Sequence, residues 1–233
     1  MFRDYSSNTR EGVIALDMSN ELVKWWWDWG VQAAVALATL VAALVALFGN
    51  AIRGKFLAPK LSLSIADPAG EKTQIRFARQ GPTGQQVVLE DARYYHLRVT
   101  NKTRWSPAHQ VQVVLLSVQE KGADGQFAIT WIGDMPTSWR HQEAYAGPRT
   151  IGPDGYADLC SVVRGQYLAL HPLIAPNNVS TRRQAPVDLL LQFQARSNEA
   201  DSPVLSVRVS WDGGWNEGAI EMQRHLAVRP HAA

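Results

Sequence analysis

The chain has 233 residues, of which 46% are hydrophobic and 19% charged, with a formal net charge of +2. This length predicts one domain of up to about 200 residues with an appendage, or two small domains. The near-neutral charge, without an acidic or basic tail, gives no reason to expect a nucleic-acid partner. The single cysteine, Cys160, excludes an intramolecular disulfide and fits a reducing compartment better than an oxidising one.

Residues 25–52 have the pattern of a transmembrane helix that follows an N-terminal tail, residues 1–24. No charged residue lies between Asp28 and Arg53. A helix of that length spans about 36 Å, enough for a hydrocarbon core of about 30 Å. Because Trp favours the headgroup zone, four tryptophans predict a membrane-interface belt: Trp25, Trp26, Trp27 and Trp29. A buried core helix and a cleaved signal peptide are the alternatives, although residues 1–30 carry three basic and five acidic groups rather than a short basic start.

The charges on either side of the apolar run predict its orientation. The N-terminal side is net acidic, whereas Arg53, Lys55 and Lys60 follow the run, and positive flanks tend to remain in the cytoplasm. We therefore expect a bacterial inner-membrane protein with its N-terminus outside and its large domain in the cytoplasm; a periplasmic domain is the alternative. The position of the initiator methionine is also left open: either the residues before Met18 form a short tail, or Met18 is the initiator.

Small residues recur at every fourth position of the apolar run and lie on one face of the predicted helix. Such a stripe allows two helix backbones to approach closely in lipid. It predicts a homo-oligomer joined through the helix; the alternative is that alanine is simply abundant here. The residues are Gly30, Ala34, Ala38, Ala42 and Ala46.

Residues 53–60 form a basic linker, and residues 61–229 change to the period of two that is typical of strands. Leu61, Leu63 and Ile65, for example, alternate with smaller or polar residues. Seven to nine short strands without long helical patterns predict a mainly β fold, an antiparallel immunoglobulin-like β-sandwich preceded by one transmembrane helix. Residues 218–228 suit a short helix or an edge strand. The other strand-like runs are residues 95–99, 111–118, 127–132, 156–163, 187–195 and 204–211.

Residues 96–114 contain the arrangement L-R-V-x-N … A-x-x-V-x-V, with Asn101 and Ala108 on either side of a polar loop. This arrangement resembles the B and C strands of bacterial immunoglobulin-like adhesion or accessory domains. Over nearly its whole length the chain also resembles an uncharacterised bacterial family of single-pass, membrane-anchored proteins. The stretches that carry this resemblance are WWWDWG at 25–30, LHPLIAPNN at 170–178 and ARSNEADSP at 195–203. The resemblance implies the architecture and brings no activity with it.

Two long segments poor in strand pattern, residues 137–155 and 165–186, predict the binding surface, because long loops in a compact domain are often functional. Arg182 and Arg183 are adjacent in the second of these segments. They either bind an anionic group such as a phosphate or are solvated. Three further tryptophans, Trp105, Trp211 and Trp215, either stack on a ligand or close the end of the sandwich. The candidates in the two segments are Trp139, Arg140, His141, His171, Asn177, Asn178, Arg182 and Arg183.

The sequence contains neither the G-x-S-x-G motif of the hydrolase nucleophile elbow nor a glycine-rich phosphate-binding motif. The six histidines are scattered, so no metal or other cofactor is expected, and His96 is expected to face outward on a strand as a surface or hydrogen-bonded residue. Asp158 and Cys160 are two apart on a predicted strand and are therefore expected to face one side, with His171 after a turn. Cys160 is then either a thiol nucleophile or a small packed hydrophobe.

Three functional hypotheses follow. The first is a membrane-anchored, non-enzymatic protein whose β-sandwich binds a protein or small ligand at the inner membrane. The second is a membrane effector or sensor, in stress response or phage defence, that oligomerises through its transmembrane helix. The third is a thiol- or His-dependent enzyme. All three have the lipid bilayer as a partner.

Overall fold

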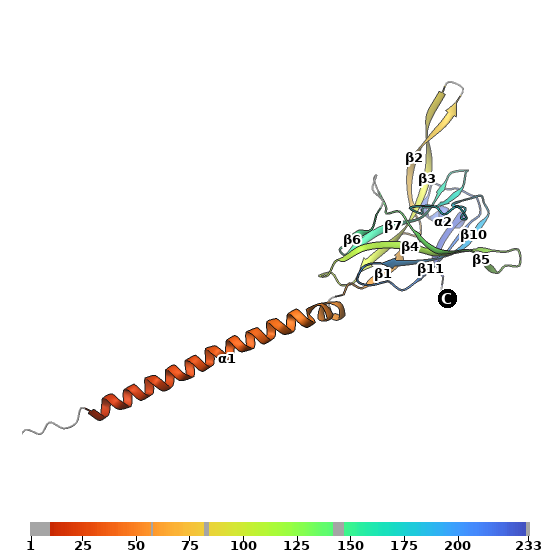
Figure 1. Ribbon diagram of the computed structural model, residues 1–233. Helices are drawn as coiled ribbons and strands as arrows, with labels where there is room; N and C mark the ends of the chain where they lie inside the picture. Colours follow the sequence, from red (N-terminus) through yellow and green to blue (C-terminus); the bar gives the residue numbers. More distant parts are fainter. Residues whose placement is uncertain (1–9, 57, 82–83, 142–146, 232–233) are drawn as a thin grey trace, which may run out of the picture. The chain divides into compact units, whose positions relative to one another are not determined.

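The computed structural model describes residues 10–56, 58–81, 84–141 and 147–231, with side chains described in 23–48, 58–76, 87–141 and 147–231. The chain divides into two compact units, Met1–Phe56 and Leu57–Ala233. The first unit contains one helix, and the second contains the β-rich domain (Figure 1).

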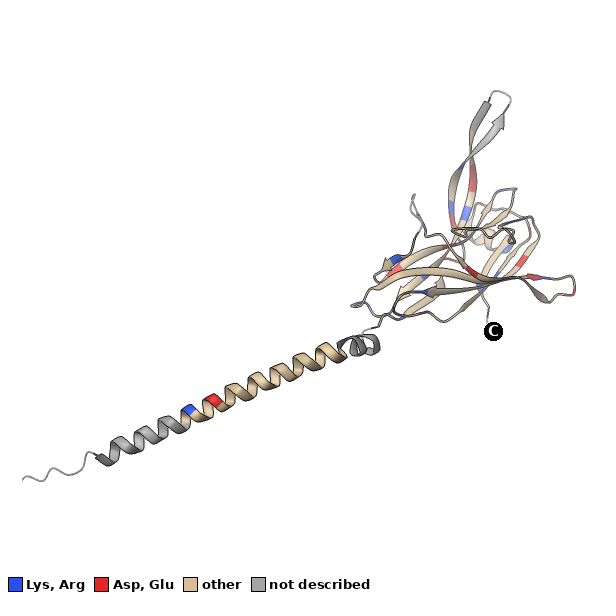
Figure 2. Cartoon of the chain, viewed as in Figure 1, with Lys and Arg blue, Asp and Glu red and all other residues tan. Residues whose placement is uncertain are grey.

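The helix α1 covers Arg10–Phe56. It therefore extends beyond the predicted segment 25–52 at both ends, into the predicted tail and linker. Within it, Val23–Phe48 is long and apolar enough to cross a membrane, and Figure 2 shows the long uncharged stretch in tan. Its polar Thr39 hydroxyl donates to the Val35 carbonyl at 2.8 Å, which satisfies the hydroxyl within the helix.

The second unit is a sandwich of two antiparallel sheets. One sheet has the order β1-β3-β7-β8-β9, with β2 paired to β3; the other has the order β12-β11-β10-β4-β5, with β6 paired to β4. The strands of the first sheet are β1 (Leu61–Ile65), β2 (Glu71–Gly81), β3 (Gly84–Asn101), β7 (Asp154–Val163), β8 (Leu168–Leu170) and β9 (Arg182–Arg183). Those of the second are β4 (Ala108–Lys121), β5 (Phe127–Pro136), β6 (Arg149–Ile151), β10 (Val187–Arg196), β11 (Leu205–Trp211) and β12 (Leu226–Pro230).

The strand order confirms the predicted immunoglobulin-like sandwich. The series β1-β3-β7 has the order of strands A, B and E of that fold, and β5-β4-β10-β11 has the order of C′, C, F and G. The stretch 96–114, expected to contain strands B and C, joins β3 to β4. Residues 218–228, which suited either a helix or a strand, form both: α2 (Ala219–His225) is followed by β12.

The core lies between the sheets and follows from the period of two along each strand. Tyr95, Leu97 and Val99 of β3 are fully buried, as are Leu191 and Phe193 of β10. The intervening residues of β3 face the other side of the first sheet. The alternating pattern thus places one set of side chains in the core and the intervening set, which includes Tyr94 and His96, on the outer face of the first sheet.

A long β2–β3 hairpin is the largest element that the sequence analysis did not predict. It pairs continuously from Glu71↔Tyr94 to Gly81↔Gly84, whereas β7 pairs with β3 only from Ala92 to Thr100. The distal part of the hairpin therefore projects beyond the sandwich as a two-stranded arm (Figure 1).

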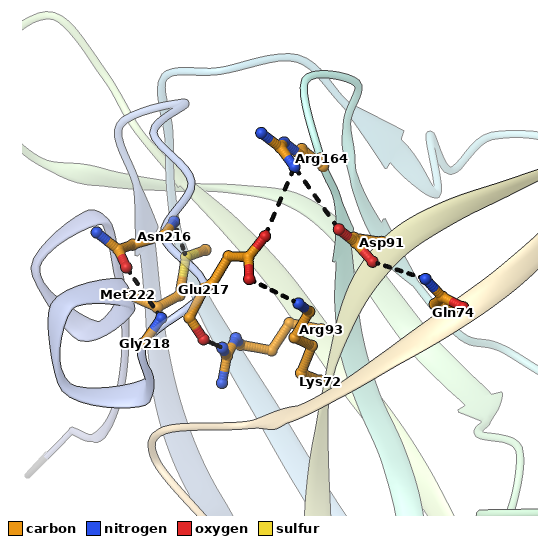
Figure 3. Close-up of polar contacts among 9 residues, drawn as sticks. All are labelled: Lys72, Gln74, Asp91, Arg93, Arg164, Asn216, Glu217, Gly218 and Met222. Atoms are coloured by element: carbon orange, nitrogen blue, oxygen red, sulfur yellow. Dashed lines mark hydrogen bonds and ion pairs between the residues drawn. The ribbon is translucent and has the colours of Figure 1, made fainter.

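The loop between β11 and α2 is joined to the first sheet through Glu217 (Figure 3). The Glu217 carboxylate lies 3.1 Å from Lys72 Nζ of β2 and 3.8 Å from Arg164 Nη1 of the β7–β8 turn. Its backbone carbonyl accepts a hydrogen bond of 2.8 Å from Arg93 Nη2 of β3. We call these contacts the Glu217 clamp, and they tie the C-terminal part of the second sheet to the base of the hairpin.

Candidate functional site

The outer face of the first sheet brings together polar side chains from three strands. Cross-strand partners in an antiparallel sheet project to the same face. Tyr94 of β3 pairs with Glu71 of β2 and with Ser161 of β7. His96 pairs with Asp158 of β7. The sheet register therefore places these five residues next to one another.

Three aromatic rings form a row on this face. The Tyr94 ring lies between His171 and His96, with ring centroids at 5.2 Å and 6.3 Å and interplanar angles of 19° and 16°. The near-parallel rings cover part of each other's faces, so a ligand above the sheet meets mainly their edges. We call this feature the ring row.

Hydrogen bonds fix both histidines of the ring row. His96 Nδ1 lies 2.9 Å from Asp158 Oδ1, and its Nε2 lies 3.8 Å from Glu71 Oε2. His171 Nε2 lies 2.8 Å from the Ser161 hydroxyl. Burial lowers the pKa of His171, with Asp158 opposing and His96 adding to this effect. Burial also raises the pKa of the Tyr94 hydroxyl, and the nearby Asp158 charge raises it further. A neutral His171 and a protonated Tyr94 are therefore favoured at neutral pH.

Two hollows adjoin at Tyr94 and Ile75, which line both. The smaller, of about 190 Å³, contains Glu71 and Asp158 beside Arg140 and His141. The larger, of about 420 Å³, contains Arg76 and Arg182 and has no carboxylate among its described lining residues. We call the two hollows together the Tyr94 groove, and its larger end is basic.

The loops at both ends of the groove are those in which the sequence analysis expected binding residues. Arg140 forms an ion pair with Glu71 and lies 6.0 Å from the centre of the Tyr156 ring. Arg182 lies 4.9 Å from the centre of the Tyr167 ring. Four predicted residues line the groove: Arg140, His141, His171 and Arg182.

Arg182 and Arg183, which the sequence analysis considered as a pair that either binds an anion or is solvated, have different surroundings. Consecutive residues of a strand point to opposite faces. Arg182 lines the groove, whereas Arg183 forms an ion pair with Glu120 of β4, in the other sheet. Burial lowers the pKa of Arg183. Arg183 thus connects the two sheets and does not line the basic end of the groove.

The tryptophan and asparagine candidates lie elsewhere. Trp139 and Trp211 are buried in the core, which corrects their assignment as ligand contacts. The Trp211 indole donates a hydrogen bond to the Gly214 carbonyl at 3.0 Å, and the half-buried Trp215 packs against the core. These two residues therefore close the sandwich. The remaining candidates are exposed and are not among the residues that line the groove: Trp105, Asn177 and Asn178.

Cys160 is a packed core residue, as one of the two interpretations predicted. It pairs with Tyr95 whereas Asp158 pairs with His96, so Leu159 is an extra residue that forms a β-bulge. The bulge turns Asp158 and Cys160 to opposite faces, and the expectation that they share one face is wrong. Cys160 is 0% exposed, and burial strongly raises its pKa. The predicted thiol dyad with His171 is therefore not formed.

Several groove residues were not predicted as site residues, namely Glu71, Arg76, Tyr94 and Ser161. Glu71, Arg76 and Tyr94 belong to the β2–β3 hairpin, which the sequence analysis did not predict, and Ser161 lies on the distant strand β7, so only the sheet register reveals the cluster. The outward alternation of Tyr94 and His96 on one strand was the available signal. His96 is hydrogen-bonded, as expected.

The groove also limits the chemistry that can occur there. Ser161 and His171 are in hydrogen-bond contact, but Ser161 is 2% exposed and the neighbouring carboxylate, Asp158, contacts His96 instead. Among the described residues there is no group of three or more His, Cys, Asp or Glu side chains arranged to hold a metal ion.

Comparisons of the chain with models of protein families, with curated proteins and with solved structures found no match.

Proposed function

We propose that this chain is a membrane-anchored, non-enzymatic binding protein whose β-sandwich recognises a small anionic ligand in the Tyr94 groove. The observation that carries the proposal is the basic end of the groove, where Arg76 and Arg182 flank the ring row. Guanidinium groups form strong, directional hydrogen bonds with phosphate and carboxylate. The hydrogen-bonded histidines hold the floor in place, so little order has to be gained on binding.

The proposal includes the location of the domain. The apolar stretch of α1 anchors the chain in a bacterial inner membrane, with the tryptophans at the outer interface and the sandwich in the cytoplasm. The support is the charge asymmetry of the flanks: Asp28 precedes the apolar stretch, whereas Arg53, Lys55 and Lys60 follow it. A cytoplasmic domain meets many small phosphorylated metabolites, which are ligands of the kind that the basic end favours.

Calorimetric titration of the full chain in detergent micelles tests the proposal, with inorganic phosphate and adenosine monophosphate as probes. We expect the wild-type chain to bind at least one probe and Arg182→Gln to weaken binding by about tenfold or more, which corresponds to about 1.4 kcal/mol. Arg229→Gln, which removes the same charge from the second sheet, is the matched control and should bind normally. Absence of binding to either probe, or an equal loss in both variants, contradicts the proposal.

A second candidate is a membrane effector or sensor that associates through its helix. The observation that favours it is the stripe from Gly30 to Ala46. A stripe of small side chains lets two helix backbones approach closely in lipid. Leucine at Ala38 and Ala42 is expected to reduce chemical cross-linking of the full chain in membranes several-fold. Leucine at Ala36 and Ala43, which lie on the opposite side of the helix, is the control; if all variants cross-link equally, the stripe is not an interface.

The enzymatic alternative is tested at the same groove. If Ser161 were a nucleophile activated by His171, a fluorophosphonate probe would label it covalently. We expect no labelling, because Ser161 is almost fully buried. Labelling that disappears in Ser161→Ala would replace the binding proposal with a hydrolase. For the thiol alternative, Cys160→Ser should leave probe binding unchanged, because the thiol packs in the core.

A further inference from the structure

The projecting arm of the β2–β3 hairpin has an open strand edge. Residues 84–91 of β3 pair with β2 on one side. On the other side β7 begins to pair only at Ala92, and no strand among the described residues continues along the arm. The last backbone hydrogen bond on that side runs from the Arg164 amide to the Asp91 carbonyl at 3.0 Å, and the Gln166 side chain of the same turn donates to the Glu90 carboxylate. Two-stranded hairpins are marginally stable alone, so this arm lacks the support that the rest of the sheet has.

The open edge carries both unpaired backbone groups and exposed apolar side chains. Backbone groups of alternate residues point to the same side of a strand. The Asp91 carbonyl points toward Arg164, on the side away from β2. The backbone carbonyls of the alternate residues Leu89 and Val87 therefore also point to this open side. The side chains of Val87 and Leu89 are 69% and 58% exposed. An edge of this kind is a template for another strand.

We propose that this edge pairs with the same edge of a second copy of the chain. Strand β3 of one copy would lie antiparallel to β3 of the other, with the two-fold axis at Val88. A two-fold axis perpendicular to the sheet makes the interface self-complementary. The result is a four-stranded sheet with the order β2-β3-β3-β2, which closes the open β3 edge of each copy and leaves β2 at the two outer edges.

The sequence of the edge selects this register. With the axis at Val88, Val87 of each copy lies opposite Leu89 of the other, and Glu90 lies opposite Gln86. Apolar residues then lie opposite apolar residues. No two acidic residues lie opposite each other, an arrangement that would be destabilising. Moving the axis to Leu89 would bring Val87 opposite Asp91 and Val88 opposite Glu90. A second copy therefore fits the edge in one register better than in the next.

A long edge strand of the second sheet, β5, provides a natural comparison. Ile129 on β5 is 62% exposed, so it resembles Val87 in exposure. Two register shifts interrupt the β4–β5 ladder, and bulges of this kind protect an edge from pairing. The β2–β3 arm is paired regularly along its length and lacks that protection.

Disulfide cross-linking of the full chain in membranes tests the interface. Val88 would face its own copy in a pair without hydrogen bonds between the two residues, where the Cα atoms are about 4.5 Å apart, a separation that a disulfide accepts. We expect Val88→Cys to form a covalent dimer under mild oxidation. The native Cys160 does not compete, because it is fully buried. Ile129→Cys is the matched control and should remain monomeric on a non-reducing gel.

A second substitution distinguishes strand pairing from chance collisions between anchored chains. Leu89→Lys in the Val88→Cys background introduces a charge opposite Val87 and should reduce cross-linking about tenfold or more. Circular dichroism of this variant should match that of Val88→Cys, since Leu89 is exposed. If Val88→Cys cross-links no faster than Ile129→Cys, or if Leu89→Lys has no effect, the second copy does not occupy this edge.

Discussion

At the scale of single residues, Gly70 has a role that its sequence context does not reveal. It adopts a φ of +69° between β1 and β2, a conformation in which side chains are disfavoured. A Cβ at this position would lie 2.7 Å from ring atoms of Tyr95, which is fully buried. The turn can therefore pass over the Tyr95 ring only because residue 70 has no side chain.

Gly70→Ala is predicted to destabilise the β-sandwich by about 2 kcal/mol or more, from backbone strain together with overpacking. For a domain of this size the midpoint of thermal unfolding should fall by about 4–8 °C. Tryptophan fluorescence of the full chain in micelles measures this. Gly165→Ala is the control, because Gly165 also has a positive φ, +67°, but no atom within 4 Å of the added Cβ. Equal shifts in the two variants would contradict the proposed clash with Tyr95.

His171 makes stability depend on pH. Because burial holds its pKa below the value of 6.5 found in an unfolded chain, the unfolded state binds the proton first as the pH falls. Stability is therefore fully present above pH 6.5 and decreases as the pH falls toward the lower pKa of the folded state. Between about pH 7.5 and about pH 5.5 the wild-type chain should lose on the order of 1 kcal/mol more than His171→Gln.

Thermal unfolding at several pH values measures this difference. His231→Gln removes an exposed histidine and should keep the pH dependence of the wild-type chain. If His171→Gln shows the same slope as the wild-type chain, protonation of another group causes the loss at low pH.

Residue-scale prediction from the sequence succeeded where it depended only on alternation along one strand. It correctly turned His96 outward. The four predicted residues that line the groove, Arg140, His141, His171 and Arg182, were chosen on a different ground, namely that they lie in long segments poor in strand pattern. It failed at Asp158 and Cys160 because a single extra residue, Leu159, reverses the face of every residue that follows it. Such a bulge depends on the partner strand and leaves no mark in the local pattern.

At the scale of elements, each strand with apolar alternation was predicted near its observed place, because burial of one face dictates that pattern. The β2–β3 hairpin was missed since much of it projects from the sandwich, and its sequence therefore lacks a consistent apolar face. The short strands β8 and β9 were also missed, as strands of two or three residues carry too little pattern to be recognised.

The base of the hairpin depends on the buried Arg93 more than on the exposed Glu217 side chain. Arg93 is 2% exposed and donates to the carbonyls of Ala69, Gly70 and Glu217 at 2.8–3.1 Å. Figure 3 shows the bond to Glu217. Arg93→Met would leave these carbonyls without their donor and should cost about 2–3 kcal/mol. Glu217→Gln should cost less than about 1 kcal/mol, because its ion pairs are largely solvent-exposed.

Urea unfolding of both variants measures the contrast. A loss in Glu217→Gln as large as that in Arg93→Met would mean that the carboxylate pairs hold the loop. In either case the Glu217 clamp links the loop before α2 to the strand that supports the groove and the arm.

At the scale of the whole molecule, the predicted sandwich and the apolar helix are separate units connected by a short segment. Helix α1 ends at Phe56 and β1 begins at Leu61. If the helix spans a membrane, the side on which the sandwich lies determines which ligands reach the groove.

The orientation is predicted to follow the basic flank. A reporter active only in the periplasm and a fluorescent reporter that functions only in the cytoplasm, each fused after Ala233 in a bacterial host, measure it. We expect the cytoplasmic signal alone. Replacing Arg53, Lys55 and Lys60 with glutamate should shift a substantial fraction of chains to the periplasmic signal, since basic flanks favour the cytoplasmic side of a membrane helix. The same replacements with arginine at Lys55 and Lys60 keep the charge and should change nothing. A periplasmic signal from the wild-type chain would reverse the orientation, and envelope components would then replace cytoplasmic phosphates as the ligands to test.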